Sequence, residues 1–140
     1  MLFRSDAAAG VAHWGSPWEI VEPGAAYKIY PCCYSTHPAV EATLNLVREH
    51  GRFDEAAIQS IESYTSAKGL LHTDRANPQS ALDAKFSVQY CVTRAALNGE
   101  VSLDHFEGDS FKDATVQSVL QRVKAAPIPD GMFQIGRAHV

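Results

Sequence analysis

Residues 28 to 37 read KIYPCCYSTH, and the rest of the chain is organised around this stretch. Pro31 has no backbone N–H and restricts Tyr30 to extended conformations, so a short extended run is expected over residues 26–30. The hydroxyls and imidazole of the following STHP run are typical of a helix start, with Pro38 near the first helical position. The sequence therefore predicts that a lysine, tyrosines, two thiols, two hydroxyls and a histidine gather where an extended segment meets a helix N-terminus.

The helix that follows has the clearest pattern in the chain. Val40, Leu44 and Val47 recur at i, i+4 and i+7, which gives one apolar stripe along residues 38–50. Gly51 comes next, a residue suited to ending a helix. The other end of this helix has free N–H groups and positive potential, so it favours an anion such as a carboxylate.

Short strands and helices alternate along the remaining chain. The expected strands cover residues 18–22, 61–65, 70–72 and 131–134. The expected helical segments are a long buried helix that begins at Asn77 and Pro78 and ends at Asn98-Gly99, a turn over 103–106 and an amphipathic helix over 109–124. This order predicts an α+β fold, with a small mixed sheet and two or three helices packed on it.

Composition limits the kind of protein. The 140 residues are enough for one domain. The net charge is −4 and no basic run is present, which argues against nucleic acid as a partner. No apolar stretch has the length of a membrane span, so no membrane partner is expected. Three cysteines, two of them adjacent, form no disulfide framework and fit a reducing, cytoplasmic location.

Both ends of the chain carry a second pattern. Residues 2–5 (LFRS) are one translation of the bases CTCTTCCGATCT, and residues 135–140 (IGRAHV) are one translation of ATCGGAAGAGCACACGTC. Both base strings resemble short-read sequencing adapters. We therefore interpret residues 1–5 and 135–140 as non-native, and residues 6–134 as a protein segment cut from a longer chain.

Lys28 and His37 are candidate catalytic residues. The Lys28 ammonium could hold a substrate carboxylate, or stabilise the enediolate that forms when a proton is removed beside it. Alternatively it is a solvated surface lysine. Histidine is the residue type whose unperturbed pKa lies closest to neutrality, so His37 could move that proton, or it could merely cap its own helix.

The thiols offer a different chemistry. Cys32 and Cys33 precede a helix N-terminus, which favours a thiolate, so Cys33 could act as a nucleophile assisted by His37. Adjacent cysteines are also common packing residues, and the C-C-x3-H spacing is not that of a zinc site. We expect no metal and no cofactor. The candidate substrate-binding residues are Tyr30, Ser35, Thr36 and Lys85, which could instead fill space or, for Lys85, reach solvent.

Three segments, KIYPCCYSTHPAVEATLNL, LDAKFSVQYCVTRAALNG and VSLDHF, together resemble the MmgE/PrpD family. That family includes 2-methylcitrate dehydratase, cis-aconitate decarboxylase and iminodisuccinate epimerase. The likeness covers most of residues 28–123 and depends chiefly on the Lys-x-Tyr-Pro…Thr-His-Pro-Ala run. It implies that the chain is the smaller α+β lid of an otherwise all-helical enzyme, usually a homodimer, with most of the helical domain missing.

The resemblance also implies roles for individual residues. Lys28 matches the active-site lysine of the K-x-Y/F-P motif, His37 matches the histidine of the T-H-P run, and Cys33 stands where the decarboxylase branch has a catalytic histidine. The implied chemistry is metal-independent proton transfer next to a carboxylate of a small di- or tricarboxylate. Loss of water, loss of carbon dioxide or inversion follows, so the parent would be a lyase such as a dehydratase, or an isomerase.

Two alternatives stay open from the residues alone. One is a thiol-dependent enzyme that uses Cys33 and His37. The other is a binding or assembly domain with no catalytic site. Under the leading hypothesis the isolated segment is expected to be inactive or nearly so, because the missing domain supplies the other half of the site.

Overall fold

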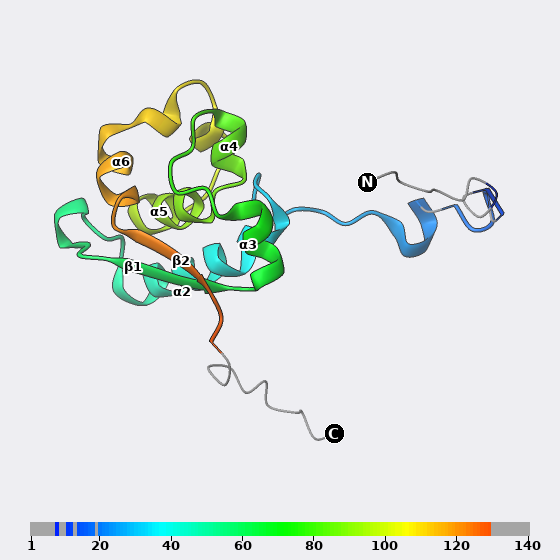
Figure 1. Cartoon of the computed structure of the whole chain (residues 1–140), viewed down its shortest axis with the longest axis horizontal. Helices are drawn as coiled ribbons and strands as arrows, with labels where there is room; N and C mark the ends of the chain where they lie inside the picture. The colour runs from blue at the N-terminus through cyan, green and yellow to red at the C-terminus, as the bar shows by residue number, and fades with distance from the viewer. Residues whose placement is uncertain (1–7, 9–10, 13, 19, 130–140) are drawn as a thin grey trace, which may run out of the picture.

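The computed structural model of the chain describes residues 8, 11–12, 14–18 and 20–129. The suspected non-native ends, residues 1–5 and 135–140, lie outside this part, and so does the expected strand over 131–134. The described residues form a helical body around a small sheet, and an arm (residues 20–29) leads away from it (Figure 1).

The body contains five α-helices and two strands within the described residues. The α-helices are α2 (His37–His50), α3 (Ala67–Thr73), α4 (Ala81–Lys85), α5 (Val88–Asn98) and α6 (Ala114–Leu120). The strands are β1 (Ile61–Thr65) and β2 (Val123–Pro127). Shorter helical turns are η1 (Ile20–Gly24), η2 (Tyr34–Thr36), η3 (Glu55–Ala57), η4 (Leu103–Phe106) and η5 (Ser110–Lys112). The expected α+β class is confirmed.

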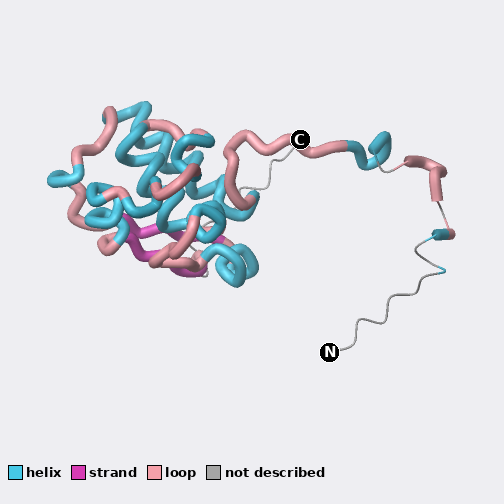
Figure 2. The backbone as a smooth tube through the Cα atoms, turned by 90° about the horizontal axis from the view of Figure 1, so that it is seen from above, coloured by secondary structure: helices cyan, strands magenta, loops and turns pink. Residues whose placement is uncertain are grey.

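The sheet is parallel, with Ile61 opposite Val123 and Thr65 opposite Pro127. Parallel neighbours need a long crossover connection, and here helices α3 to α6 lie between the two strands in the chain. Figure 2 shows the two strands side by side at one side of the helical body.

Helix α5 is the centre of the core. Every residue from Val88 to Ala96 is buried, as expected for a helix that is apolar nearly all round. It packs against α2, α4, α6 and both strands. The cluster on one side of α5 joins Tyr30 and Cys32 to α2, and the cluster on the other side joins Ile58 and Val123 to α5. The helix that carries the site is therefore held by the most buried element of the fold.

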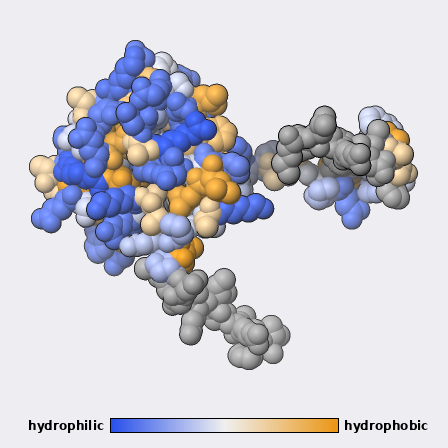
Figure 3. Space-filling model, viewed as in Figure 1, coloured by the Kyte–Doolittle hydropathy of each residue, from blue (hydrophilic) through white to orange (hydrophobic). Residues whose placement is uncertain are grey.

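The surface of the described residues has both apolar and hydrophilic patches. Figure 3 shows apolar atoms in separate patches among hydrophilic ones, including one over α3. In the part of the chain that the structure describes, no helix combines the length and the apolar run needed to cross a bilayer.

The expected strand over 70–72 is wrong, because these residues belong to α3. Ser66 caps that helix: its hydroxyl accepts a hydrogen bond from the Gly69 N–H at 3.0 Å. A serine hydroxyl that satisfies a free N–H favours a helix start, and this cap outweighs the apolar Leu70-Leu71 pair that suggested a strand.

The expected long helix from Asn77 is two helices. The first, α4, begins at Ala81 with Ser80 as its cap. It ends at Lys85, and Phe86 and Ser87 separate it from α5. Ser87 causes the second start, because its hydroxyl accepts from the Tyr90 N–H at 3.0 Å and donates to the Arg75 carbonyl at 2.6 Å. A side chain that bonds nearby backbone groups competes with a continuous helix.

The expected helix over 109–124 is also divided. It splits into η5, α6 and the start of β2, and Asp113 caps α6 by accepting from the Val116 N–H at 3.1 Å. Val123 lies within this expected helix, but it is buried as the first residue of β2 opposite Ile61. The pairing of β2 with β1 therefore outweighs the short helical pattern of these residues.

The chain before α2 forms no strand in its described residues. The extended run expected over residues 26–30 pairs with no strand, and the chain bends at residues 29 and 30 before Pro31. The expected strand over 18–22 is wrong for its described residues: the turn η1 covers Ile20–Gly24, and only Glu22 is extended inside it, with φ −144° and ψ 116°. Glu19 lies outside the described residues.

Ser87→Ala should lower the free energy of unfolding of this chain by about 2 kcal/mol, because the buried hydroxyl both caps α5 and donates to Arg75. Ser80→Ala removes the exposed cap of α4 and should cost less than about 1 kcal/mol. Urea unfolding followed by circular dichroism measures both. If both variants lowered the free energy of unfolding equally, α5 would not be the centre of the core.

Candidate active site at the start of helix α2

A tight loop leads into α2 and brings the predicted site residues together. The Lys28 ammonium donates to the Cys32 carbonyl at 3.2 Å. The Thr36 hydroxyl and N–H both donate to the Cys33 carbonyl, at 2.7 and 2.9 Å. The Cys33 N–H donates to the Lys85 carbonyl at 2.8 Å, which fixes the loop to the end of α4. Backbone and side-chain hydrogen bonds thus hold this irregular segment in one conformation.

The expected helix start is confirmed, but its expected capping is not. Helix α2 begins at His37 with Pro38 in its first turn, and Gly51 ends it with a φ of 83°. Thr36 occupies the cap position without a side-chain cap hydrogen bond. Its hydroxyl is directed back to the Cys33 carbonyl instead. The first N–H groups of α2 therefore receive no bond from that hydroxyl.

His37 lies buried between two aromatic rings, with 9% of its surface exposed. Its ring centre is 5.2 Å from that of Tyr30, edge to face, and 4.9 Å from that of Tyr34. Among the described residues, no group hydrogen-bonds to its Nε2 atom. An unpaired buried polar atom costs about 1–3 kcal/mol, and such atoms are uncommon. The Nε2 atom is thus an unsatisfied polar atom in the interior of the described chain.

Tyr30 is held by a charged pair on α2. Its hydroxyl donates to Glu41, which also accepts from Arg48 at 2.8 Å. Burial and the bond to Glu41 raise the pKa of Tyr30 to about 12, so its phenol stays protonated at neutral pH. Glu41 is not among the site residues predicted from the sequence. The signal was its spacing of two helical turns from Arg48, which places both on one face of α2.

The thiol with the unusual environment is Cys32. Its sulfur is 3.0 Å from the Thr36 hydroxyl, and only 2% of the residue is exposed. Hydrogen bonding with Cys91, hydrogen bonding with Thr36 and the nearby charge of Lys28 lower the pKa of Cys32 to about 7, although burial opposes them. The same interaction raises the pKa of Cys91. The sequence favoured Cys33, because a sequence pattern does not show which of two adjacent cysteines turns toward α5.

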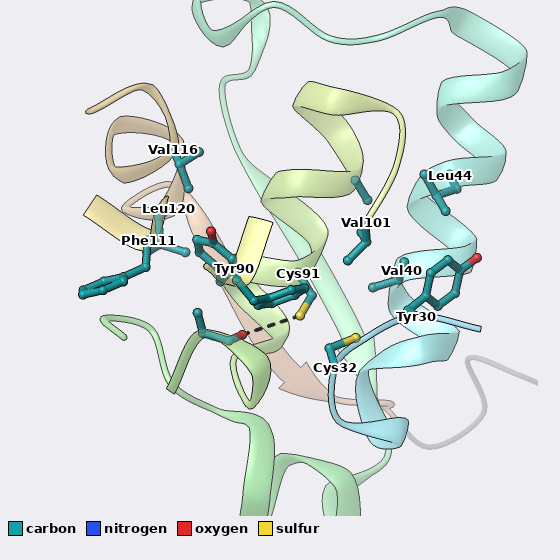
Figure 4. Packing of buried hydrophobic residues seen from close by; sticks show 13 residues of the cluster. Tyr30, Cys32, Val40, Leu44, Tyr90, Cys91, Val101, Phe111, Val116 and Leu120 are labelled. Carbon is teal, nitrogen blue, oxygen red and sulfur yellow. Dashed lines mark hydrogen bonds between the residues drawn. The ribbon is translucent and has the colours of Figure 1, made fainter. Parts of the chain in front are cut away.

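Figure 4 shows how these residues meet in the core. Cys32 lies close to Val40 of α2 on one side and Cys91 of α5 on the other, while the Tyr30 hydroxyl points to the outside of the cluster. The Cys91 thiol also donates to the Ala84 carbonyl at 3.7 Å. The two buried thiols therefore join the loop to α5.

Ser35 and Lys85 flank the loop. Ser35 packs on α3, where a Cβ placed on Gly69 would lie 3.4 Å from the Ser35 Cβ. The Lys85 ammonium lies 6.0 Å from the ring centre of Phe106, and its carbonyl accepts from Cys33. Both residues support the loop, and their roles in substrate binding stay predictions.

A separate apolar groove of about 660 Å³ lies between α2 and β1. It begins at Pro38, next to His37, and runs past Ala42 and Leu46. Lys28, Cys33 and His37 do not line it. The described residues also contain no group of three or more His, Cys, Asp or Glu that could hold a metal ion.

Comparison with known proteins identifies one family. A family model described as the MmgE/PrpD C-terminal domain matches residues 30–132, well over half of the 140 residues. The match includes Cys33, Thr36 and His37 and begins two residues after Lys28. No curated protein matches the chain.

The ultraviolet absorbance of the thiolate should show one group that titrates near pH 7 in the folded chain. Cys32→Ser should abolish it, and Thr36→Val should move it to higher pH, because a hydrogen bond to the thiolate is lost. Since the folded pKa lies below the ordinary value of 9.0, this thiolate stabilises the fold fully above pH 9. That stabilisation is lost as the pH falls through about 7. If the titration near pH 7 persists in Cys32→Ser, the titrating group is not Cys32.

Proposed function

Because this chain belongs to the MmgE/PrpD family and carries its C-terminal domain, we propose that it is part of a lyase or isomerase that acts on a small di- or tricarboxylate. The proposed step is proton transfer at a carbon next to a carboxylate, as in a 2-methylcitrate dehydratase. One observation carries this proposal: the buried Nε2 atom of His37, which has no hydrogen-bond partner among the described residues.

His37 is the proposed proton carrier. Its ring is wedged between Tyr30 and Tyr34, so its orientation is fixed before a substrate binds. An imidazole nitrogen that faces a substrate can take a proton from it and return it later. The Tyr30 phenol, protonated and bonded to Glu41, helps to keep the ring in place.

Lys28 is the proposed anion holder. It is exposed, and its ammonium bonds only to the Cys32 carbonyl among the contacts of the described residues. Turning to a carboxylate would exchange that bond to a neutral carbonyl for one in which both partners are charged. The start of α2, a helix of 14 residues, adds positive potential on the same loop. Together they would stabilise the enediolate while His37 holds the proton.

The supporting residues have narrower proposed roles. The half-buried Ser35 and Cys33 would contact the substrate from the loop. Thr36 and Lys85 would act through the positions they give to their neighbours, because the Thr36 hydroxyl and the Lys85 carbonyl are bonded within the loop. Tyr30 would orient His37 more than it binds substrate, because its hydroxyl is held by Glu41.

The rest of the site is proposed to come from a helical domain of the same parent chain. Lys28 faces outward, and its neighbours Tyr27 and Ile29 are 88% and 81% exposed. Large apolar side chains exposed beside a functional residue favour coverage by another surface. We further propose a cytoplasmic, homodimeric parent, with little or no activity for this chain alone.

The alternative is a thiol-dependent enzyme that uses Cys33 and His37. Its supporting observation is a loop in which a thiolate is stabilised. However, the stabilised thiolate is Cys32, which is 2% exposed, and the His37 Nε2 atom forms no hydrogen bond to the Cys33 thiol. A non-catalytic binding domain would not need an unpaired imidazole nitrogen in its interior.

In the full-length parent, His37→Gln and Lys28→Met should each lower kcat about 100-fold or more, because each removes a group that acts in the transition state. Cys33→Ala should retain activity within about tenfold, and His50→Gln at the exposed end of α2 should behave as the wild type. Steady-state turnover of 2-methylcitrate and related polycarboxylates measures these effects.

Two outcomes would count against the proposal. Wild-type turnover by Lys28→Met or His37→Gln would remove that residue from the mechanism. Loss of turnover in Cys33→Ala, with both other variants active, would favour the thiol enzyme instead.

A further inference from the structure

Two buried thiols from separate parts of the chain meet in the core beside the candidate site. Cys32 belongs to the loop before α2 and Cys91 belongs to α5, and both are members of one core cluster (Figure 4). Their thiols hydrogen-bond to each other, and the Cys32 sulfur also lies 3.0 Å from the Thr36 hydroxyl. Both thiols are free. A reactive thiol next to a second thiol is typical of a redox-sensitive site.

The two thiols differ in acidity. Hydrogen bonding with Cys91 is the largest cause that lowers the pKa of Cys32 to about 7, and the same interaction, together with burial, raises the pKa of Cys91. The thiolate is the form of cysteine that reacts with an oxidant. Near neutral pH, Cys32 is therefore the thiol that reacts first, and Cys91 is the protonated neighbour in contact with it.

The third cysteine, Cys33, lies outside this cluster. It is half-buried, whereas Cys32 and Cys91 are both buried. Reagents that react with the most accessible thiol would select Cys33. A reaction that selects the pair in contact would instead consume Cys32 and Cys91 and leave Cys33 free, so the two kinds of reaction can be told apart by their products.

We propose that Cys32 and Cys91 form a site of reversible oxidation, at which a peroxide converts the two thiols into a disulfide. The Cys32 thiolate attacks one peroxide oxygen, the O–O bond breaks, and hydroxide leaves as the Cys32 sulfur becomes a sulfenic acid. The Cys91 sulfur then displaces the hydroxyl from Cys32, and the S–S bond forms as the Cys91 proton leaves with that hydroxyl as water. The two sulfurs together lose two electrons, which the peroxide takes up. This inference does not depend on the proposed function.

The burial of the pair favours a small oxidant. Cys32 is 2% exposed and Cys91 has no exposed surface. Cys32 lies in a segment without regular secondary structure, and such segments open at a lower free energy than the helices around them. Hydrogen peroxide needs only a small opening of this loop to reach Cys32. Because Cys91 already contacts Cys32, the disulfide forms before a second peroxide can oxidise the sulfenic acid further.

The disulfide would draw the loop toward α5. Its two sulfurs lie about 2.05 Å apart, closer than two thiols that share a hydrogen bond. The Cys32 carbonyl accepts from the Lys28 ammonium, and the Thr36 hydroxyl beside the Cys32 sulfur comes directly before His37. A shift of Cys32 therefore reaches the residues on both sides of it. A resulting change in turnover of the parent is a consequence that rests on the proposed function, whereas formation of the disulfide does not.

Peptide mapping of the 140-residue chain after treatment with hydrogen peroxide tests the site. The product should have lost two hydrogen atoms in mass and should keep one of its three thiols free in denaturant. Trypsin cuts after lysine and arginine, so a digest without reductant should join the peptide of residues 29–48 to that of residues 86–94. Dithiothreitol should separate these peptides and restore all three thiols.

Cys33→Ser is the matched control, because the peptide of residues 29–48 contains both Cys32 and Cys33. In this variant Cys32 and Cys91 are the remaining thiols of the chain, so a disulfide within one chain can only join that pair. It should form at the wild-type rate. In Cys91→Ser no disulfide should form within the chain, and Cys32 should accumulate as a sulfenic acid that dimedone traps.

Three results would overturn the proposal. One is a Cys33→Ser chain that keeps both thiols free at peroxide concentrations that leave its circular dichroism native. Another is a link between the same two peptides that forms in Cys32→Ser, because Cys33 would then be the partner of Cys91. The third is a disulfide that forms only after urea has unfolded the chain. The wild type and Cys33→Ser decide the question even if a substitution in the core prevents folding.

Discussion

The attachment of one loop to the core determines where the functional groups lie. The Cys33 N–H bonds to the Lys85 carbonyl at 2.8 Å, while Tyr30 and Cys32, on either side of Pro31, are buried against α2 and α5. A segment without regular secondary structure still needs partners for its backbone N–H and C=O groups, and here neighbouring segments provide them. Directly after this loop α2 begins at His37, whose ring packs against the rings of Tyr30 and Tyr34.

The polar groups of the loop differ in whether they have hydrogen-bond partners. The Thr36 hydroxyl, the Cys32 thiol and the Tyr30 phenol each bond to a protein partner. The buried Nε2 atom of His37 bonds to none of the described residues. Buried polar atoms usually have a hydrogen-bond partner, and this exception is the observation behind the proposed role of His37. The membership in the MmgE/PrpD family and this geometry lead to the same proposed acid–base role.

The sequence predicted the elements that local chemistry determines. Pro38, the stripe that begins at Val40, and Gly51 define α2, and the apolar pattern around Tyr90 identifies the buried helix. The predicted secondary structure was wrong where a single side chain or a residue distant in the sequence determines the local conformation. Ser66 and Ser87 start helices that periodicity did not reveal, and Val123 becomes a strand residue only because Ile61 lies beside it. In the site, Lys28 and His37 were visible in the motif. Cys91 and Glu41 were not, because their roles depend on the packing of α5 and α2 against the loop.

The most direct test of the account is nitrogen NMR of the histidine side chains in the full-length parent, titrated with a tricarboxylate that does not react. The account predicts a saturable change at the Nε2 atom of His37, whereas exposed His50 at the far end of α2 should not respond. A His37 signal that stays unchanged at saturating ligand, or that moves no more than that of His50, would contradict the assignment of His37 as the group that faces the substrate.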